Sequence, residues 1–173
     1  MTQPTRDEAV ATLDGLRHQV LTLLARVPEG QRTRTGIGGG DWSVKDLLGH
    51  LAHWESLAVE AIEAWGREAR PQAEEYFAGG AEAIDAANAA DVERKSGWDY
   101  EDVRTDADEV HERLLGAIRG MTDEDWHRTA PYPAERRNTM VSLVGSILGA
   151  PKAPFGHASA HLPDLEAFVS GLA

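Results

Sequence analysis

Three histidines have the residue type and the spacing to bind one metal ion. His157 and His161 lie four residues apart, and on a helix this spacing brings both side chains to the same face, one turn apart. Two imidazoles in that arrangement can coordinate a single ion, as in known His-x-x-x-His metal sites. The pair alone is a weak signal, because helical chains contain such spacings without any metal.

His50 is the candidate for a third ligand. It lies among Leu, Ala and Trp residues of a segment that we expect to be helical, and a buried neutral imidazole needs a polar partner. A metal ion shared with His157 and His161 would be such a partner. A hydrogen bond to a backbone carbonyl is the alternative, which would make His50 an ordinary core histidine.

Two neighbours of His50 are candidates for catalysis and for cofactor binding. His53 lies about 60° around the helix from His50, close enough to act as a general base in the same cleft. Alternatively, His53 is a fourth metal ligand or an ordinary residue on the rim of the cleft. Glu55 points about 140° away from His50, so His53 is preferred. Trp54 is the residue expected to contact a bound cofactor, although its spacing also fits a core position.

The remaining histidines and tryptophans have weaker patterns. His18, His111 and His127 lie among charged neighbours and are expected at the surface without a role. The other tryptophans could line a cleft or belong to the core; they are Trp42, Trp65, Trp98 and Trp126.

The periodicity of apolar residues predicts helices to position these side chains. Long helices are expected over residues 7–27, 43–65 and 100–119, and further helices over residues 139–148 and 155–168. Ser43 with Asp46, and Thr122 with Asp125, have the spacing of N-terminal capping motifs. Pro163 predicts a kink in the last helix or a boundary between two helices.

The Ala-rich stretch over residues 81–95 predicts an extra short helix, either an insertion or a helix across the end of the bundle. The sequence therefore predicts an all-α four-helix bundle with this addition, as one domain over residues 1–173.

Composition excludes several classes of site and partner. The chain has no cysteine, which excludes disulfides, a thiolate nucleophile and Cys-ligated metals. A net charge of −12 argues against nucleic acid and anionic membranes as partners. There is no signal-peptide core and no apolar run of about 18 residues. We therefore expect a cytoplasmic protein with a small-molecule substrate.

Residues 41–55 resemble the second helix of the DinB-like superfamily. In that family a Trp-Ser start is followed about seven residues later by a His-Leu pair, as in Ser43 and His50 here. Its other two metal ligands come from a His-x-x-x-His motif near the C-terminus, which His157 and His161 match. The superfamily includes YfiT-type proteins, classed as metal-dependent hydrolases, and thiol-dependent transferases and isomerases.

This resemblance implies an up-down-down-up bundle, a three-histidine site for zinc, nickel or a similar divalent ion, and a homodimer. Residues 88–126 are similar to the ClbS/DfsB-type branch, whose characterised members protect producers from their own genotoxic metabolites. That branch commonly lacks the C-terminal histidine pair, which His157 and His161 form here. The loop over residues 149–154, directly before that pair, is an unexpected interruption.

Three functions are compatible with these patterns. The first is an enzyme that acts on a small electrophilic molecule at the metal, by hydrolysis or by transfer of a low-molecular-weight thiol. Because the chain has no cysteine, any thiol must come from such a cofactor. The second is a self-resistance protein that binds or hydrolyses a reactive metabolite, with or without a metal. The third is a bundle that keeps the histidines but has no catalytic role.

Overall fold

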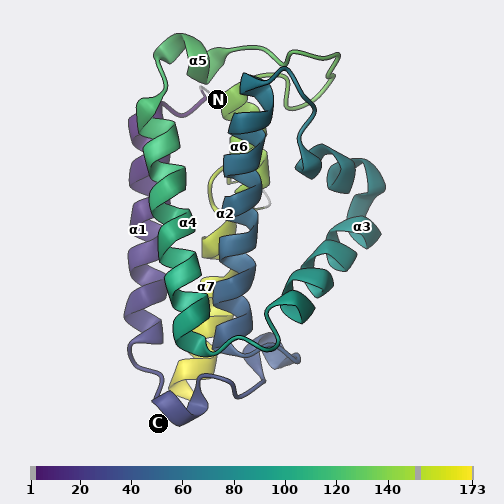
Figure 1. Ribbon diagram of the computed structural model, residues 1–173. Coiled ribbons are helices and arrows are strands. Elements are labelled where there is room, and N and C mark those ends of the chain that lie inside the picture. Colours follow the sequence, from purple (N-terminus) through teal and green to yellow (C-terminus); the bar gives the residue numbers. More distant parts are fainter. Residues whose placement is uncertain (1–2, 151–152, 173) are drawn as a thin grey trace.

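A computed structural model describes residues 3–150 and 153–172 and shows a helical chain (Figure 1). Its α-helices are α1 (Arg6–Leu24), α2 (Val44–Gly66), α3 (Gln72–Arg94), α4 (Tyr100–Gly120), α5 (Asp123–His127), α6 (Met140–Ile147) and α7 (His157–Ser170). Two 3₁₀ turns, η1 (Glu29–Gln31) and η2 (Ile37–Gly39), lie between α1 and α2. Within the described residues there are two isolated β-bridges and no strand. The predicted all-α class is confirmed.

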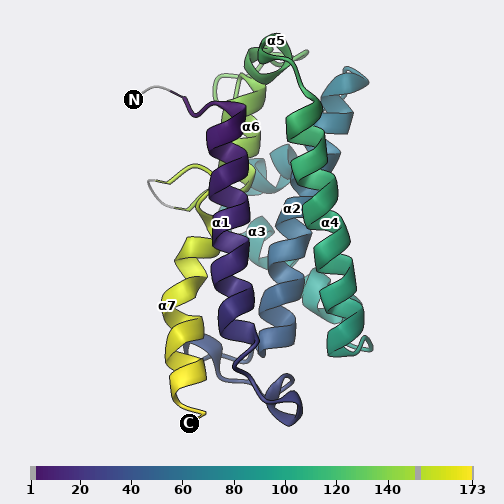
Figure 2. The same cartoon turned by 90° about the vertical axis from the view of Figure 1, so that its left-hand side faces the viewer.

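Four columns of helix form the bundle. In Figure 1, α1 runs downward, α2 and α4 run upward side by side, and α6 followed by α7 runs downward again. Figure 2 shows α7 beside α1, on the face away from α4. The order of directions is therefore up-down-down-up, as the resemblance to the DinB-like superfamily implies.

The starts of the helices are fixed by side chains that cap free backbone N–H groups. Ser43 accepts a hydrogen bond from the backbone of Asp46, and the Asp46 carboxylate accepts one from the backbone of Ser43. The same reciprocal pair joins Thr122 and Asp125 at α5. Both predicted capping motifs are confirmed, and the first sets the register of α2 and therefore the direction of His50.

The helices enclose two clusters of buried apolar side chains, which meet along α2. Leu47, Leu48 and Leu51 belong to the cluster shared with η2, α4 and α7. Trp54 and Leu57 belong to the other cluster, which includes side chains from α4 and α6. The segment of α2 that carries His50 and His53 thus lies where the two clusters join.

Helix α3 differs from the prediction in length and position. It begins at Gln72 rather than at Ala81, and it bends at Gly80, whose φ of 69° and ψ of −156° are not helical. Figure 1 shows it on the flank of α2, not across the end of the bundle. The Ala-rich stretch predicted only the second part of α3. The first part of the helix is not Ala-rich and carries two aromatic side chains, Tyr76 and Phe77, that pack against the core.

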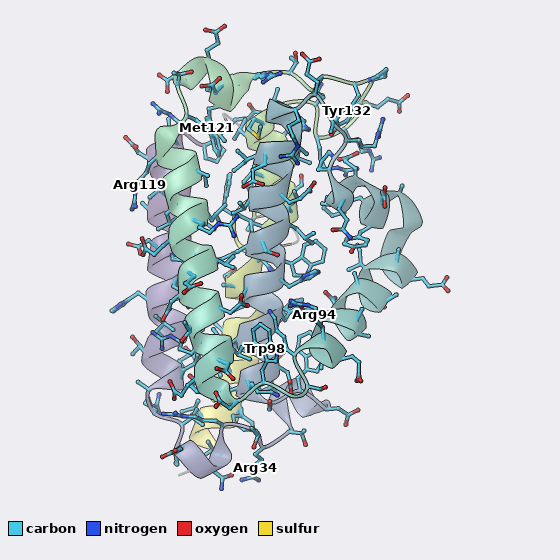
Figure 3. The ribbon with its side chains drawn as sticks, in the orientation of Figure 1. Arg34, Arg94, Trp98, Arg119, Met121 and Tyr132 are labelled. Carbon is cyan, nitrogen blue, oxygen red and sulfur yellow. The ribbon has the colours of Figure 1, made fainter. Side chains whose placement is uncertain are left out.

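A buried charged cluster attaches the end of α3 to α2. The Lys95 ammonium donates to the carbonyl of Gly49 at 3.0 Å and lies 3.4 Å from Asp91 and 3.3 Å from Asp106. The Lys45 ammonium donates to three carbonyls of the turn after α3, at 3.1–3.2 Å. In Figure 3, Arg94 and Trp98 mark this end of α3. A buried cation that reaches several oxygen acceptors holds these segments in a defined register.

The last helix continues through Pro163 and is a single element in the structure. Phe155, where the sequence predicts its start, lies outside it because its φ of 61° is left-handed. None of the helices in the described part of the chain has both the length and the hydropathy that a membrane span requires.

Candidate metal centre

His50, His157 and His161 come together at one point between α2 and α7. The Nε2 atoms of His50 and His157 are 3.0 Å apart, and those of His157 and His161 are 3.3 Å apart. One ring nitrogen from each of the three lies within 4.8 Å of the others. The structure therefore assembles the three residues that the sequence singled out.

The separations suit a shared metal ion. Ligand nitrogens about 2.0–2.1 Å from one ion, at angles of about 90–110°, lie about 2.9–3.4 Å from one another. Two of the separations at the site, 3.0 and 3.3 Å, fall in this range. Three imidazoles are also a donor set that zinc, nickel, copper and iron all accept. The residues present thus fit a divalent transition metal.

His50 is held by aromatic neighbours on α2 and on the loop before it. Its ring lies 4.8 Å from that of Trp42 and 6.5 Å from that of Trp54, and its side chain is buried. Its Nδ1 has no hydrogen-bond partner among the described residues. Packing on both sides therefore fixes the ring while Nε2 points to His157.

His157 is positioned by the turn that joins α6 to α7. Its backbone N–H donates to the Leu148 carbonyl at 2.8 Å, which ties the start of α7 to the end of α6. Phe155 is buried, stacks on Trp126 at 5.9 Å, and adopts its left-handed φ to do so. That conformation costs free energy for a side chain with a Cβ. The unexpected loop before the histidine pair thus delivers His157 to the site; residues 151 and 152 of that loop lie outside the described part.

The site keeps its imidazoles uncharged. Burial, followed by repulsion from the neighbouring imidazoles, lowers the pKa of His50 to about 2. Burial and the charge of His161 lower the pKa of His157 to about 3. Burial also lowers the pKa of His161, and nearby Asp164 opposes that shift. Because the neutral imidazole is the form that binds metals, all three nitrogens are available at neutral pH.

A cavity of about 320 Å³ opens beside the three histidines. Its lining is completed by residues, most of them apolar, from the loop before α2, from α2, α3 and α6, and from the turn after α6. These residues are Trp42, Trp54, Phe77, Ile84, Asn88, Ser146, Ile147 and Gly149. Among the described residues of this lining none has a carboxylate, an ammonium or a guanidinium group. A volume near the lower end of ligand pockets indicates a small guest molecule.

The two further predicted site residues have different surroundings. Trp54 lines the cavity and stacks on Phe77 at 6.4 Å, while most of its surface is buried. His53 faces α3, where its Nδ1 lies 3.6 Å from an Asp91 oxygen, and it is not among the residues that line the cavity. Burial lowers the pKa of His53, and Asp91 opposes that shift. The roles predicted for these two residues stay predictions.

The tryptophans divide between core and cleft. Trp65 and Trp126 are fully buried, and Trp98 packs against the core near the end of α3. Trp42 and Trp54 line the cavity. The sequence left open whether the tryptophans line a cleft or belong to the core, and the structure contains examples of both.

The prediction that His111 is a surface residue is wrong. It is buried, and its Nδ1 lies 2.9 Å from an Oε1 atom of Glu55. The charged neighbours that indicated exposure lie on the outer face of α4, while His111 is on the inner face, one residue after buried Val110. His18 and His127 are exposed, as expected.

Sequence reasoning missed Asn88 as a residue of the site. Its Oδ1 accepts a hydrogen bond from the Trp54 indole N–H at 2.9 Å, and its side chain lines the cavity. The Asn88 amide also opposes the lowering of the His50 pKa. An isolated asparagine in an Ala-rich helix gives no signal, and the only hint is a polar amide on the side of α3 that carries Ile84 and Asp91.

Comparisons with known proteins agree with this fold and identify the family. The family model described as the DinB superfamily matches residues 12–149. That region includes His50 but ends before His157 and His161. A search of curated proteins gives no match.

One solved structure is similar over nearly the whole chain. It is the crystal structure of an uncharacterised protein from Escherichia coli UTI89, with 17% sequence identity and a TM-score of 0.76. The similarity covers 99% of this chain and 95% of that one. At this identity the likeness concerns the fold alone.

Proposed function

Because this chain belongs to the DinB superfamily and brings three neutral imidazoles together beside an aromatic cavity, we propose that it is a metal-dependent enzyme acting on a small electrophilic molecule. The observation that carries the proposal is the approach of three Nε2 atoms from two helices that are far apart in sequence. His50, His157 and His161 would hold the ion, for which zinc and nickel are the leading candidates.

The chain's own residues would bind and shield the substrate. Trp42, Trp54 and Phe77 offer apolar surfaces against which a small molecule can lie next to the imidazoles. A bound ion would supply Lewis acidity, which activates a nucleophile near neutral pH. All three histidines line the cavity, so a molecule bound there would lie next to them.

Between the two reaction types, the volume of the cavity favours hydrolysis. About 320 Å³ suits one small guest and water, whereas thiol transfer requires the electrophile and a low-molecular-weight thiol to be bound together. His53 lies beside Asp91 and outside the cavity lining. We therefore propose that it holds α3 against α2 and does not transfer a proton to the substrate. The homodimer stays a prediction.

Metal uptake is the first test. Protein freed of metal with a chelator is titrated with Zn²⁺ and with Ni²⁺, and the bound metal is measured by elemental analysis after desalting. We expect one ion per chain for the wild type and loss of uptake in His157→Ala and His161→Ala. The exposed histidines provide matched controls, so His18→Ala and His127→Ala should bind like the wild type. Uptake that is unchanged in His157→Ala would contradict the assigned ligands.

Turnover of an apolar electrophile separates the reaction types. Zinc-loaded and nickel-loaded protein are incubated with styrene oxide, with and without glutathione, and the products are separated by chromatography. The proposal expects the diol without thiol, and none from His157→Ala. A product that forms only with glutathione would indicate thiol transfer instead. Binding of the epoxide without either product would indicate a protein that sequesters such molecules.

A further inference from the structure

The cavity beside the histidines has apolar walls and very few polar side chains. Trp42, Trp54, Phe77, Ile84 and Ile147 provide the apolar surface. Apart from the histidines, the polar side chains among its described lining residues are Asn88 and Ser146. In such a setting one correctly placed polar group determines which molecules bind and in which orientation.

The hydrogen bond to Trp54 fixes the orientation of the Asn88 amide. An indole N–H can only donate, so the amide atom 2.9 Å from it must be the oxygen. The amide nitrogen therefore points away from Trp54 with two N–H donors. No hydrogen bond from this nitrogen is found among the described residues, it is not a fully buried atom, and the amide lies near enough to His50 to affect its pKa. The cavity that Asn88 lines is where these donors are open to a guest molecule.

Ser146 does not offer an equivalent donor. Its hydroxyl hydrogen is already used, because Oγ donates to the Ser142 carbonyl one turn earlier in α6, at 2.7 Å. The hydroxyl oxygen can still accept a hydrogen bond. Ser146 is thus a natural control for Asn88, since it lines the same cavity but has no free hydrogen to donate.

The helix that carries Asn88 is firmly attached at this point. Asp91 and Lys95 follow Asn88 at helical spacings of three and seven residues and therefore share its face. Both are buried, and the Lys95 ammonium is bonded to the Gly49 carbonyl, next to His50. The distance between Asn88 and the histidine cluster is therefore set by a buried brace and not by a free side chain.

We propose that the cavity selects an uncharged, flat, apolar molecule that carries an oxygen acceptor, such as a ketone, an ester or an epoxide, and that Asn88 Nδ2 donates to this oxygen. Asn88 is thus the specificity-determining residue of the site. The inference rests on the proposed function in one respect, namely that this cavity is where the substrate binds. A hydrogen bond of this kind strengthens binding about three- to tenfold.

A pair of matched probes tests the proposal on metal-free protein. 2-Acetylnaphthalene has a carbonyl oxygen, and 2-ethylnaphthalene has nearly the same shape without it. We expect the wild type to bind the ketone about three- to tenfold more tightly than the hydrocarbon by calorimetric titration at pH 8. Asn88→Asp keeps an acceptor for Trp54 and has no donor when ionised, so it should bind the ketone no more tightly than the hydrocarbon. Ser146→Ala should keep the preference.

Two further measurements keep the test decisive if Asn88→Asp is unstable. Trp54→Phe removes the N–H that orients the amide, so the preference for the ketone should fall while the hydrocarbon still binds. In ¹⁵N-labelled wild-type protein, the Asn88 side-chain amide signals should shift with the ketone and not with the hydrocarbon.

Three results would overturn the proposal. These are equal affinity of the wild type for both probes, an unchanged preference in Asn88→Asp, or tighter binding of the anionic probe 2-naphthoate than of the ketone. Because no metal is present, these results are independent of the metal titration. Failure of metal uptake with an intact ketone preference would contradict the proposed function and leave the role of Asn88 standing.

Discussion

At the scale of single residues, the candidate site depends on three imidazoles that stay neutral in a buried position. His50 and His157 have an ordinary pKa of 6.5 in an unfolded chain, and the fold lowers these pKa values to about 2 and about 3. At pH values between these limits the unfolded chain binds protons that the folded chain excludes. The contribution of these two neutral imidazoles to the stability of the metal-free protein is therefore fully present above about pH 6.5 and is lost as the pH falls towards 3.

We predict this loss to be about 1.4 kcal/mol per pH unit for each of the two histidines. Urea unfolding of chelator-treated protein between about pH 7 and about pH 4.5 measures it. His50→Gln removes one of the titrating groups, so its free energy of unfolding should fall less steeply with decreasing pH. His18→Ala is the control, because that residue is exposed. Equal slopes for His50→Gln and wild type would contradict the assignment.

Residue spacing predicts which side chains of one helix lie together, but not which side chains of different helices meet. The i, i+4 spacing predicted that His157 and His161 share a face, because the geometry of one helix determines which of its side chains lie together. That His50 joins them from another helix was implied by the resemblance of residues 41–55 to the DinB-like superfamily. Asn88 and the burial of His111 depend on contacts between helices. Neither residue has a periodic signal of its own, so only the packed structure identifies the partners, Trp54 and Glu55.

At the scale of elements, amphipathic periodicity was a reliable guide to α1, α2 and α4. Their apolar stripes became the buried faces, and α2 begins at the predicted cap, Ser43. It was less informative for α3, whose hydrophobic residues are sparse and whose bend interrupts the period. The turn before α7 could not be predicted either, since the left-handed Phe155 is stabilised by its tertiary contact with Trp126.

The bend of α3 leads to a prediction about Gly80. Its φ of 69° and ψ of −156° belong to a region that is almost restricted to glycine. Phe77 and Ile84 lie on opposite sides of the bend, and both line the cavity. Gly80→Ala should therefore lower the free energy of unfolding by about 1–3 kcal/mol and should weaken binding of the naphthalene probes.

Gly116 in α4 is the matched control for this substitution. It is an exposed helical glycine, and a Cβ added there meets nothing within 4 Å. Gly116→Ala should stabilise the protein by about 0.5–1 kcal/mol, because alanine loses less conformational entropy in a helix. Thermal and urea unfolding of both variants provide the comparison. A Gly80→Ala variant as stable as the wild type would mean that the bend is not needed.

At the scale of the whole molecule, the three histidines join helices that are distant in sequence. His50 lies on α2, near the start of the chain, and the other two lie on α7, at its end. Among the described residues, α2 contacts α7 at far fewer places than it contacts α4. A metal at the cluster would therefore act as a cross-link where direct packing of these two helices is sparse.

This arrangement predicts that metal binding raises the melting temperature. An ion that binds the folded chain alone, at a free concentration of about 100 times its Kd, adds about 2.7 kcal/mol of stability. For a chain of this size, each kcal/mol raises Tm by about 2–4 °C, so a shift of about 5–10 °C is expected with Zn²⁺ or Ni²⁺. His157→Ala should show no such shift, since two imidazoles hold the ion less tightly than three. His127→Ala should retain it, and an equal shift in His157→Ala would place the ion elsewhere in the molecule.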